Sequence, residues 1–384
     1  MKAEGVSLLV GLDGKRAVEN NTGLGNYSRY ALNMLSLGFP ASRFRLYAPR
    51  PKENDRLEPL LARENVEIAY GPDRFGAAGR AFWRTFDMAI DLKRDGVDIY
   101  HGLSNEIPLW APKACATVVT IHDLIYRRCP ADYSAIDRRM YDFKYGRSAK
   151  IASRVIAISE CTRRDLISDY QIDPAKIDVI YQGIDPIFTL DIPTSKRHEV
   201  RARYGLPDVY IACVGTVQPR KNQLLAVRAL AKLPAAVKLV IVGRMSGDYG
   251  RMVSAEISRL GLSDRVMHLE GIPFADLPAI YADAAVSVYP SRYEGFGLPV
   301  VESITVGTPV IAATGSCLEE AGGPGAVYIN PDDADSLARE AMHIIDDRIF
   351  HDKLVRHGQK YVKKFSADNF AKATMETYHK AILS

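Results

Sequence analysis

The chain has 384 residues, of which 47% are hydrophobic and 25% charged, as is ordinary for a globular protein large enough to form two domains. The formal charge of +4 gives no reason to expect a nucleic-acid partner. The five cysteines form no C-x-x-C pair, which excludes a cysteine zinc site and argues against a disulfide framework. There is no apolar run of 18 residues, and we expect no signal peptide. Composition therefore excludes membrane-spanning, small secreted and fibrous proteins and predicts a cytoplasmic one.

In the first half of the chain, short apolar runs rich in β-branched residues alternate with longer helical patterns. The runs predict strands at Ser7–Leu12, Phe44–Ala48, Val66–Tyr70, Val97–His101, Thr117–His122 and Arg154–Ser159. The helical patterns lie at Asn26–Leu37, Arg80–Arg94 and Ala135–Ala152. This alternation predicts a mostly parallel sheet covered by helices on both faces.

Residues Asp185–Lys196 lose the pattern and are predicted to be an interdomain linker, after which the alternation restarts. Further strands are expected at Val209–Val214, Val237–Val242, Val266–Leu269, Ala285–Tyr289 and Val310–Ala313. Further helices are expected at Leu224–Leu233, Val253–Leu260, Leu277–Asp283, Val300–Val306, Ala334–Ile345 and Phe365–Leu383. The predicted fold is α/β, with two tandem doubly wound, Rossmann-like domains over 1–187 and 188–364 and a terminal helix over 365–384. Ligands of such sheets bind beyond the carboxyl ends of the strands.

The strongest candidate site is Ser291–Glu302, which reads SRYEGFGLPVVE and follows a predicted strand. Gly295 and Gly297 would let backbone N–H groups approach a ligand, and the proline after them suits the start of a helix. A helix N-terminus of this kind favours phosphate. Glu302, expected in the first helical turn, is suited to accept hydrogen bonds from two ribose hydroxyls, while Glu294 faces another part of the ligand. In the alternative, Glu302 only complements the helix dipole and Glu294 is a solvated loop acid.

Glu294 and Glu302 are separated by seven residues, and the phrase YEGFGLPVVE with the later GTPVI resembles the E-x7-E motif of retaining glycosyltransferases of family four, which have the GT-B fold. The likeness covers nearly the whole chain, is most specific from about 209 to 331 and is weakest over 50–95. Further segments that carry it are Val214–Thr216, Pro219–Asn222, Val240–Gly243, Thr120–Asp123 and Ile180–Asp185. It implies two domains facing a cleft, the first binding the acceptor and the second the nucleotide sugar, with the terminal helix 365–384 packing back on the first.

The resemblance also implies roles for single residues. Glu302 takes the ribose hydroxyls, and Glu294, with the backbone of Gly295, Phe296, Gly297 and Leu298, holds the donor sugar and its phosphates. Arg220 and Lys221 hold the diphosphate, where cations stabilise the negative charge that grows as the glycosidic bond breaks. Without the resemblance, two exposed charges in a turn are the simpler interpretation of Arg220 and Lys221.

Three other positions are weaker candidates. His122 ends a strand, so it is expected at the edge of the cleft, and the resemblance places it near the donor sugar in an orienting role; a lone histidine is more often structural. Gly23 and Gly25 are expected in a loop that starts a helix, and the resemblance implies that this loop faces the donor phosphates and the acceptor. Gly271 and Ile272 follow a strand and are expected to hold the base by backbone contacts.

The resemblance implies no metal and no cofactor, since the nucleotide sugar is a substrate. Asp333 and Asp335 have Asp-x-Asp spacing, but we expect an N-terminal helix cap there. Residues 127–164 hold ten basic residues against four acidic ones, which favours a solvated helix face. The alternative is contact with an anionic membrane, at its inner face, or with a diphospholipid acceptor.

The sequence therefore predicts a retaining glycosyltransferase that moves a hexose to a hydroxyl of a glycan or lipid-linked saccharide. The phrase at 291–302 most resembles bacterial mannosyltransferases of polysaccharide biosynthesis, which favours GDP-mannose over a UDP-sugar. No covalent nucleophile is evident, so we expect same-face displacement, with Glu294 as nucleophile the less favoured option. The alternatives are a UDP-sugar-dependent glucosyltransferase, a sugar-nucleotide epimerase or a silent nucleotide-sugar-binding subunit. The sequence makes no prediction of oligomeric state.

Overall fold

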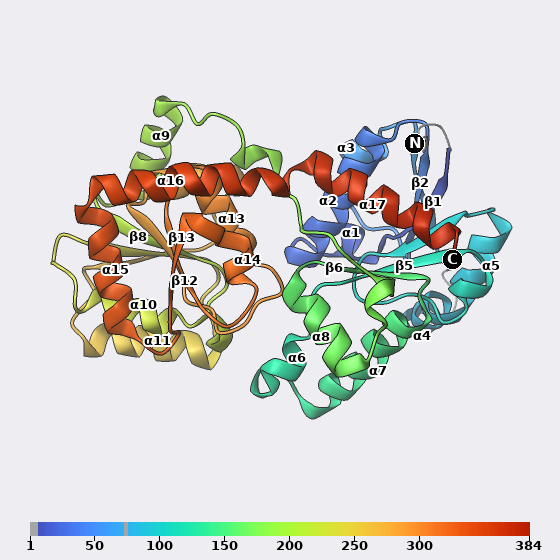
Figure 1. Ribbon diagram of the computed structural model, residues 1–384, viewed down its shortest axis with the longest axis horizontal. Helices are drawn as coiled ribbons and strands as arrows, with labels where there is room; N and C mark the ends of the chain where they lie inside the picture. Colours follow the sequence, from blue (N-terminus) through green and yellow to red (C-terminus); the bar gives the residue numbers. More distant parts are fainter. Residues whose placement is uncertain (1–6, 73–75) are drawn as a thin grey trace. The chain divides into compact units, whose positions relative to one another are not determined.

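The computed structural model describes residues 7–72 and 76–384, and the chain forms two compact units (Figure 1). The first comprises Met1–Tyr126, Tyr133–Gly183 and Ala367–Ser384, and the second comprises Arg127–Asp132 and Ile184–Ser366. Apart from the short segment 127–132, the chain passes between the units at 183/184 and 366/367, where the sequence predicts domain boundaries at 187/188 and 364/365. The short segment 127–132, expected in the first domain, belongs to the second unit.

The described part of the first unit contains a seven-stranded parallel sheet in the order β3-β2-β1-β4-β5-β6-β7. Its strands are β1 (Leu9–Asp13), β2 (Arg43–Ala48), β3 (Val66–Tyr70), β4 (Ile99–Gly102), β5 (Ala116–Ile121), β6 (Arg154–Ala157) and β7 (Ile177–Val179). The central strands are buried on both faces, as expected for apolar runs in a parallel sheet. The strand order reverses between β1 and β4, where Gly11 lies opposite Tyr100.

The helices that lie or begin in the first unit are α1 (Lys15–Glu19), α2 (Gly23–Gly38), α3 (Glu58–Leu61), α4 (Gly76–Phe82), α5 (Met88–Arg94), α6 (Ile125–Arg128), α7 (Ala135–Ile151), α8 (Glu160–Tyr170) and α17 (Ala367–Ile382). A π-helical turn, η1 (Trp83–Asp87), joins α4 to α5, so the helix expected at 80–94 is continuous but irregular. The side chains of Ser134 and Ser159 cap α7 and α8 by accepting hydrogen bonds from backbone N–H groups. Short 3-10 turns are η2 (Ala111–Lys113), η3 (Pro130–Asp132) and η4 (Pro174–Lys176).

The last helix, α17, belongs to the first unit and lies alongside α2 (Figure 1). A buried network of hydrogen-bonded polar groups holds α17 against the first sheet. The Tyr378 hydroxyl lies 2.7 Å from His101 Nδ1, and His101 Nε2 lies 2.8 Å from the Thr120 hydroxyl, which is 3.1 Å from that of Tyr27. Burial lowers the pKa of His101 to about 3, so the ring is neutral and is held by two hydroxyl groups.

The described part of the second unit contains a six-stranded parallel sheet in the order β10-β9-β8-β11-β12-β13. Its strands are β8 (Tyr210–Val214), β9 (Lys238–Val242), β10 (Val266–Leu269), β11 (Val286–Tyr289), β12 (Val310–Ala313) and β13 (Ala326–Ile329). The order reverses between β8 and β11, so the loops after these two strands meet at the switch point where doubly wound sheets bind ligands.

The helices of the second unit are α9 (Thr194–Tyr204), α10 (Gln223–Leu230), α11 (Gly247–Arg259), α12 (Leu277–Asp283), α13 (Leu298–Thr305), α14 (Leu318–Gly322), α15 (Ala334–Asp346) and α16 (Arg348–Val362). Its 3-10 turns are η5 (Pro186–Phe188), η6 (Pro219–Lys221), η7 (Phe274–Asp276), η8 (Gly323–Gly325) and η9 (Lys363–Phe365). The Asp333 carboxylate accepts from Ser336 N at 2.9 Å, which confirms the cap expected there. The stretch 185–196 is not featureless, because η5 and the start of α9 lie in it. Within residues 7–72 and 76–384, no helix has the length and apolar character needed to cross a bilayer.

Candidate active site

The loops after β8 and β11 bring three of the expected site residues together at the switch point of the second sheet. Gly215 follows β8, and the turn η6 then presents Arg220 and Lys221. Asn222 ends that turn with a φ of 57°, a left-handed conformation that asparagine tolerates, and its side-chain amide donates to the carbonyls of Pro290 and Pro331. These bonds hold the basic turn against the loop that carries Glu294.

Glu294 is paired with Arg220. Their Oε2 and Nη1 atoms lie 2.6 Å apart, and each side chain is only 11% exposed. The Tyr289 hydroxyl donates to Glu294 Oε1 at 3.0 Å, and Lys221 Nζ donates to the Tyr289 hydroxyl at 3.2 Å. Arg220 also donates to the carbonyl of Tyr293 at 2.5 Å. Both carboxylate oxygens of Glu294 are therefore engaged by donors of the same unit.

Electrostatics keep the Glu294 carboxylate charged. Burial acts to raise its pKa, but the positive charges of Lys221 and Arg220 outweigh this and hold the pKa below its usual value. The same Lys221 charge also acts to lower the pKa of Glu302. One ammonium group is thus within electrostatic reach of both acids of the E-x7-E segment.

Glu302 lies in the second turn of α13, because the helix begins at Leu298; the sequence-based placement in the first turn was wrong. Its half-buried carboxyl accepts a hydrogen bond from the Tyr281 hydroxyl at 3.4 Å. Burial, with a contribution from Asp185, raises its pKa to about 7. Glu302 is therefore poised between its two protonation states near neutral pH, unlike Glu294.

A glycine opens α13, as expected. Gly297 is the N-terminal cap with a φ of 104°, where L-residues are strained, and a Cβ added there would lie 2.7 Å from Leu318 Cδ2. Before it, the buried Phe296 ring packs on Phe365 with the ring centres 5.1 Å apart, and the Cys317 thiol donates to the Glu294 carbonyl at 3.1 Å. These contacts fix the backbone of the glycine loop.

Replacing Gly297 with alanine is expected to lower the free energy of unfolding by about 1–3 kcal/mol, since it adds a clash to the cost of the left-handed backbone. Urea denaturation measures this effect. Gly261→Ala is the matched control, because Gly261 has a φ of 66° but open space around its Cβ position. Equal losses in the two variants would mean that contact with Leu318 contributes nothing.

The other predicted residues belong to other segments of the chain. His122, in the first unit, directly follows the carboxyl end of β5, as expected, and its side chain is buried; its place near the donor sugar stays a prediction. Its Nε2 bonds the Leu103 carbonyl at 2.8 Å, so that nitrogen carries the proton, and Nδ1 accepts from the Gln182 amide at 3.2 Å. Burial lowers its pKa to about 4, and the Tyr27 ring packs edge-on at 4.5 Å.

The glycine loop expected before the first long helix is also different. Gly23 and Gly25 lie in the first turn of α2, after the unexpected short helix α1. Gly23 is exposed with no atom near its Cβ position, but a Cβ on Gly25 would lie 1.8 Å from the carbonyl oxygen of Asn20. Gly25 therefore serves close packing of backbone on helix.

Gly271 and Ile272 follow β10, the edge strand of the second sheet, rather than the central strands β8 and β11. Gly271 is exposed with a φ of 70°, and Ile272 is half-buried. That Gly271 and Ile272 contact the base of the nucleotide stays a prediction. Sequence reasoning missed Tyr289, Tyr281, Cys317 and Asp185, although Tyr289 ends a predicted strand at the switch point and could have been found from that position alone.

Models of two protein families match the chain. The model described as glycosyl transferases group 1 matches residues 196–361, and the model described as glycosyltransferase family 4 matches residues 35–188. The chain is 28% identical to O-antigen chain mannosyltransferase B of Escherichia coli, over 73% of this chain and 74% of that protein. It is 31% identical to the D-inositol 3-phosphate glycosyltransferase of Mycolicibacterium smegmatis, over 60% and 54%.

A solved structure, Anabaena Alr3699/HepE in complex with UDP, superposes with a TM-score of 0.75 at 20% identity, covering 97% of this chain and all of that one. This likeness concerns the fold, and it agrees with the two parallel α/β sheets described above. It confirms the expected fold class, and the matched family models with the named relatives confirm the expected enzyme class. The protein is a glycosyltransferase with the GT-B fold.

Proposed function

We propose that the protein is a retaining glycosyltransferase of the E-x7-E type that moves mannose from GDP-mannose to a hydroxyl of a glycan or lipid-linked acceptor. The observation that carries this proposal is the cluster of Arg220, Lys221, Tyr289 and Glu294 at the switch point, with Glu302 on the helix that follows. The mannose assignment is supported by the likeness to the mannosyltransferase of Escherichia coli. The bound UDP of the Anabaena protein supports a nucleotide-sugar donor in general.

In this proposal Lys221 is the main cation for the leaving diphosphate. Arg220 is already engaged by Glu294 and by the Tyr293 carbonyl, whereas Lys221 reaches only the Tyr289 hydroxyl among the bonds described for it. Lys221 also lies close to Gly215, where a Cβ would sit 2.8 Å from its Nζ. The glycine thus leaves room for the ammonium beside the end of β8.

The environment of Glu294 supports same-face displacement over a covalent intermediate. A carboxylate that accepts from Arg220 and Tyr289 and has a lowered pKa is a weak nucleophile. We therefore assign Glu294 to the donor sugar as a hydrogen-bond acceptor. A leaving phosphate oxygen then takes the proton of the acceptor hydroxyl as the new bond forms on the same face.

Calorimetric titration with GDP, UDP and ADP tests the donor assignment. We expect GDP to bind more tightly than the other two nucleotides. Preference for UDP would overturn the mannose proposal and favour a UDP-sugar, and binding of none would overturn the nucleotide site. Incubation with GDP-mannose alone tests the transferase against an epimerase, because only an epimerase would turn the donor over without an acceptor.

Glu302 gives this binding a pH dependence. The ribose hydroxyls need a carboxylate to accept from, so GDP affinity is expected to rise as pH increases through about 7. The raised pKa also means that the nucleotide-free protein loses stability as pH rises from the ordinary value of 4.5 through 7. Glu302→Gln should flatten both dependences and weaken GDP binding at high pH by about 1–3 kcal/mol. Titrations at several pH values measure the effect.

The exposed Glu319 of α14 offers a matched control for this substitution. Glu319→Gln should leave both the affinity and its pH dependence as in the wild type. An unchanged pH profile in Glu302→Gln would show that another group causes the dependence.

A further inference from the structure

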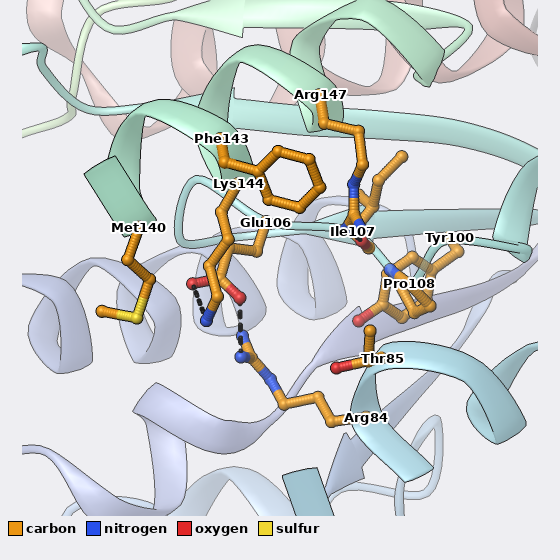
Figure 2. A pocket seen from close by; sticks show the side chains of 10 residues that line it. All are labelled: Arg84, Thr85, Tyr100, Glu106, Ile107, Pro108, Met140, Phe143, Lys144 and Arg147. Atoms are coloured by element: carbon orange, nitrogen blue, oxygen red, sulfur yellow. Dashed lines mark hydrogen bonds and ion pairs between the residues drawn. The ribbon is translucent and has the colours of Figure 1, made fainter. Parts of the chain in front are cut away.

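The first sheet also has a switch point, between β1 and β4, and a cavity of about 130 Å³ lies beside it (Figure 2). Tyr100 of β4 lines this cavity, together with the loop that follows β4, the π-helical turn η1 and the helix α7. None of the residues assigned above to the nucleotide-sugar donor lines this cavity. The volume equals that of roughly four water molecules, which is room for a phosphate group.

A fixed ion-pair network forms the wall of the cavity. Arg84 donates to Asp13 Oδ2 at 2.9 Å and to Glu106 Oε2 at 3.0 Å. Burial acts to raise the pKa of Asp13, but Arg84 outweighs it, so Asp13 stays charged. Lys144 Nζ of α7 lies 3.5 Å from Glu106 Oε1, and Figure 2 shows Arg84 and Lys144 on the two oxygens of this carboxylate. Glu106 therefore has no oxygen that is not already paired.

A hydrogen-bond donor that lines the cavity has no acceptor in the described structure. Arg147 also lines it, and its Nη2 donates to the Ile107 carbonyl at 3.3 Å. Its Nε is buried without a hydrogen-bond partner in the described structure. Three cations, Arg84, Lys144 and Arg147, therefore stand against two carboxylates, Asp13 and Glu106, which are both already paired. A ligand rich in acceptors and negative in charge complements such a lining.

An exposed apolar stripe leads along α7 to the cavity. Ile136, Met140 and Phe143 are spaced as neighbours on one helix face and are 80%, 40% and 66% exposed. Arg147 continues the same face, and Met140 and Phe143 line the cavity itself. Cationic and apolar groups thus lie side by side on one helix, as an amphiphilic anion requires.

We infer that this cavity binds the phosphate or diphosphate group of the acceptor and that the α7 stripe contacts an apolar chain attached to it. The inference rests on the proposed function, because it names the acceptor class of that reaction. It also specifies which basic residues of the stretch 127–164 take part, namely Lys144 and Arg147, whereas others of that stretch, such as Lys150, are solvated.

Intrinsic fluorescence offers a direct test, because the only two tryptophans of the chain, Trp83 and Trp110, flank the segments that line the cavity. Monododecyl phosphate, below its micelle concentration, should bind and change this fluorescence. Lys144→Ala should weaken binding about tenfold, the effect of losing a charged hydrogen bond. Lys150→Ala, an exposed lysine of the same helix, should not. Phe143→Ser should weaken dodecyl phosphate and leave inorganic phosphate unaffected.

Other outcomes would overturn the inference. Equal binding of dodecyltrimethylammonium would show that charge is not recognised, and equal losses in Lys144→Ala and Lys150→Ala, with dodecyl phosphate or with phosphatidylglycerol vesicles, would indicate a diffuse surface effect. Equal affinities for inorganic phosphate and dodecyl phosphate would show that the α7 stripe does not contact the apolar chain of the ligand. GDP titration and thermal melting of the same samples separate the hypotheses: GDP binding without dodecyl phosphate binding refutes only the cavity, and the reverse refutes only the donor site.

Discussion

Replacing Glu294 with alanine is expected to lower the free energy of unfolding of the second unit by about 3–5 kcal/mol. The substitution removes the ion-pair partner of the Arg220 guanidinium in a site where the arginine side chain is only 11% exposed. It also removes the acceptor of the Tyr289 hydroxyl. Differential scanning calorimetry measures the loss.

Two further variants test whether the loss of stability comes from the broken ion pair of Glu294 with Arg220. Glu319→Ala, at an exposed glutamate of the same unit, should change stability by a few tenths of a kcal/mol at most. Removing both charges, in Glu294→Ala with Arg220→Ala, should destabilise less than the sum of the single changes. Additive losses would show that the two side chains do not stabilise one another.

Lys221→Ala is expected to lower kcat by about 100- to 1000-fold, the range found when one preorganised donor to a developing charge is removed. The donor KM should change much less, because the diphosphate gains most of its charge as the bond breaks. Steady-state kinetics with GDP-mannose and an accepted acceptor measure both quantities.

Lys353 of α16 is an exposed lysine of the same unit, and Lys353→Ala should behave as the wild type. A large rise in KM with unchanged kcat in Lys221→Ala would mean that the lysine contributes to ground-state binding alone. Lys221→Arg should keep part of the kcat that Lys221→Ala loses, because arginine also carries a positive charge.

The positions of most strands along the chain and of the glycine-opened helix could be predicted, because apolar runs and glycines are local signals, whereas the short strands β7 and β13 were missed. The helix α16 was missed for an equally local reason. Its buried stripe consists of Leu354, Gly358 and Val362, and a glycine in that stripe hides the apolar period. Gly358 is buried because it packs on Gly325, where a Cβ would lie 2.9 Å from the Gly325 Cα.

The site was predictable in its residue types but not in its pairings. The ion pair of Arg220 and Glu294 joins loops that lie more than seventy residues apart, and nothing in either loop indicates the other. The burial of His122 could not be predicted for the same reason, because the Tyr27 ring that packs on it lies on a helix much earlier in the sequence. The raised pKa of Glu302 likewise depends on burial and on Asp185, which only the folded chain brings near.

The buried contact of Tyr378 with His101 has a practical consequence for dividing the gene. A fragment ending at residue 183 would contain the whole first sheet but lack α17, so His101 Nδ1 would lose its Tyr378 partner and the core residues that pack against Phe370, Met375 and Tyr378 would be uncovered. Expression of the first unit by itself therefore calls for a fusion in which a short linker connects residue 183 directly to residue 367.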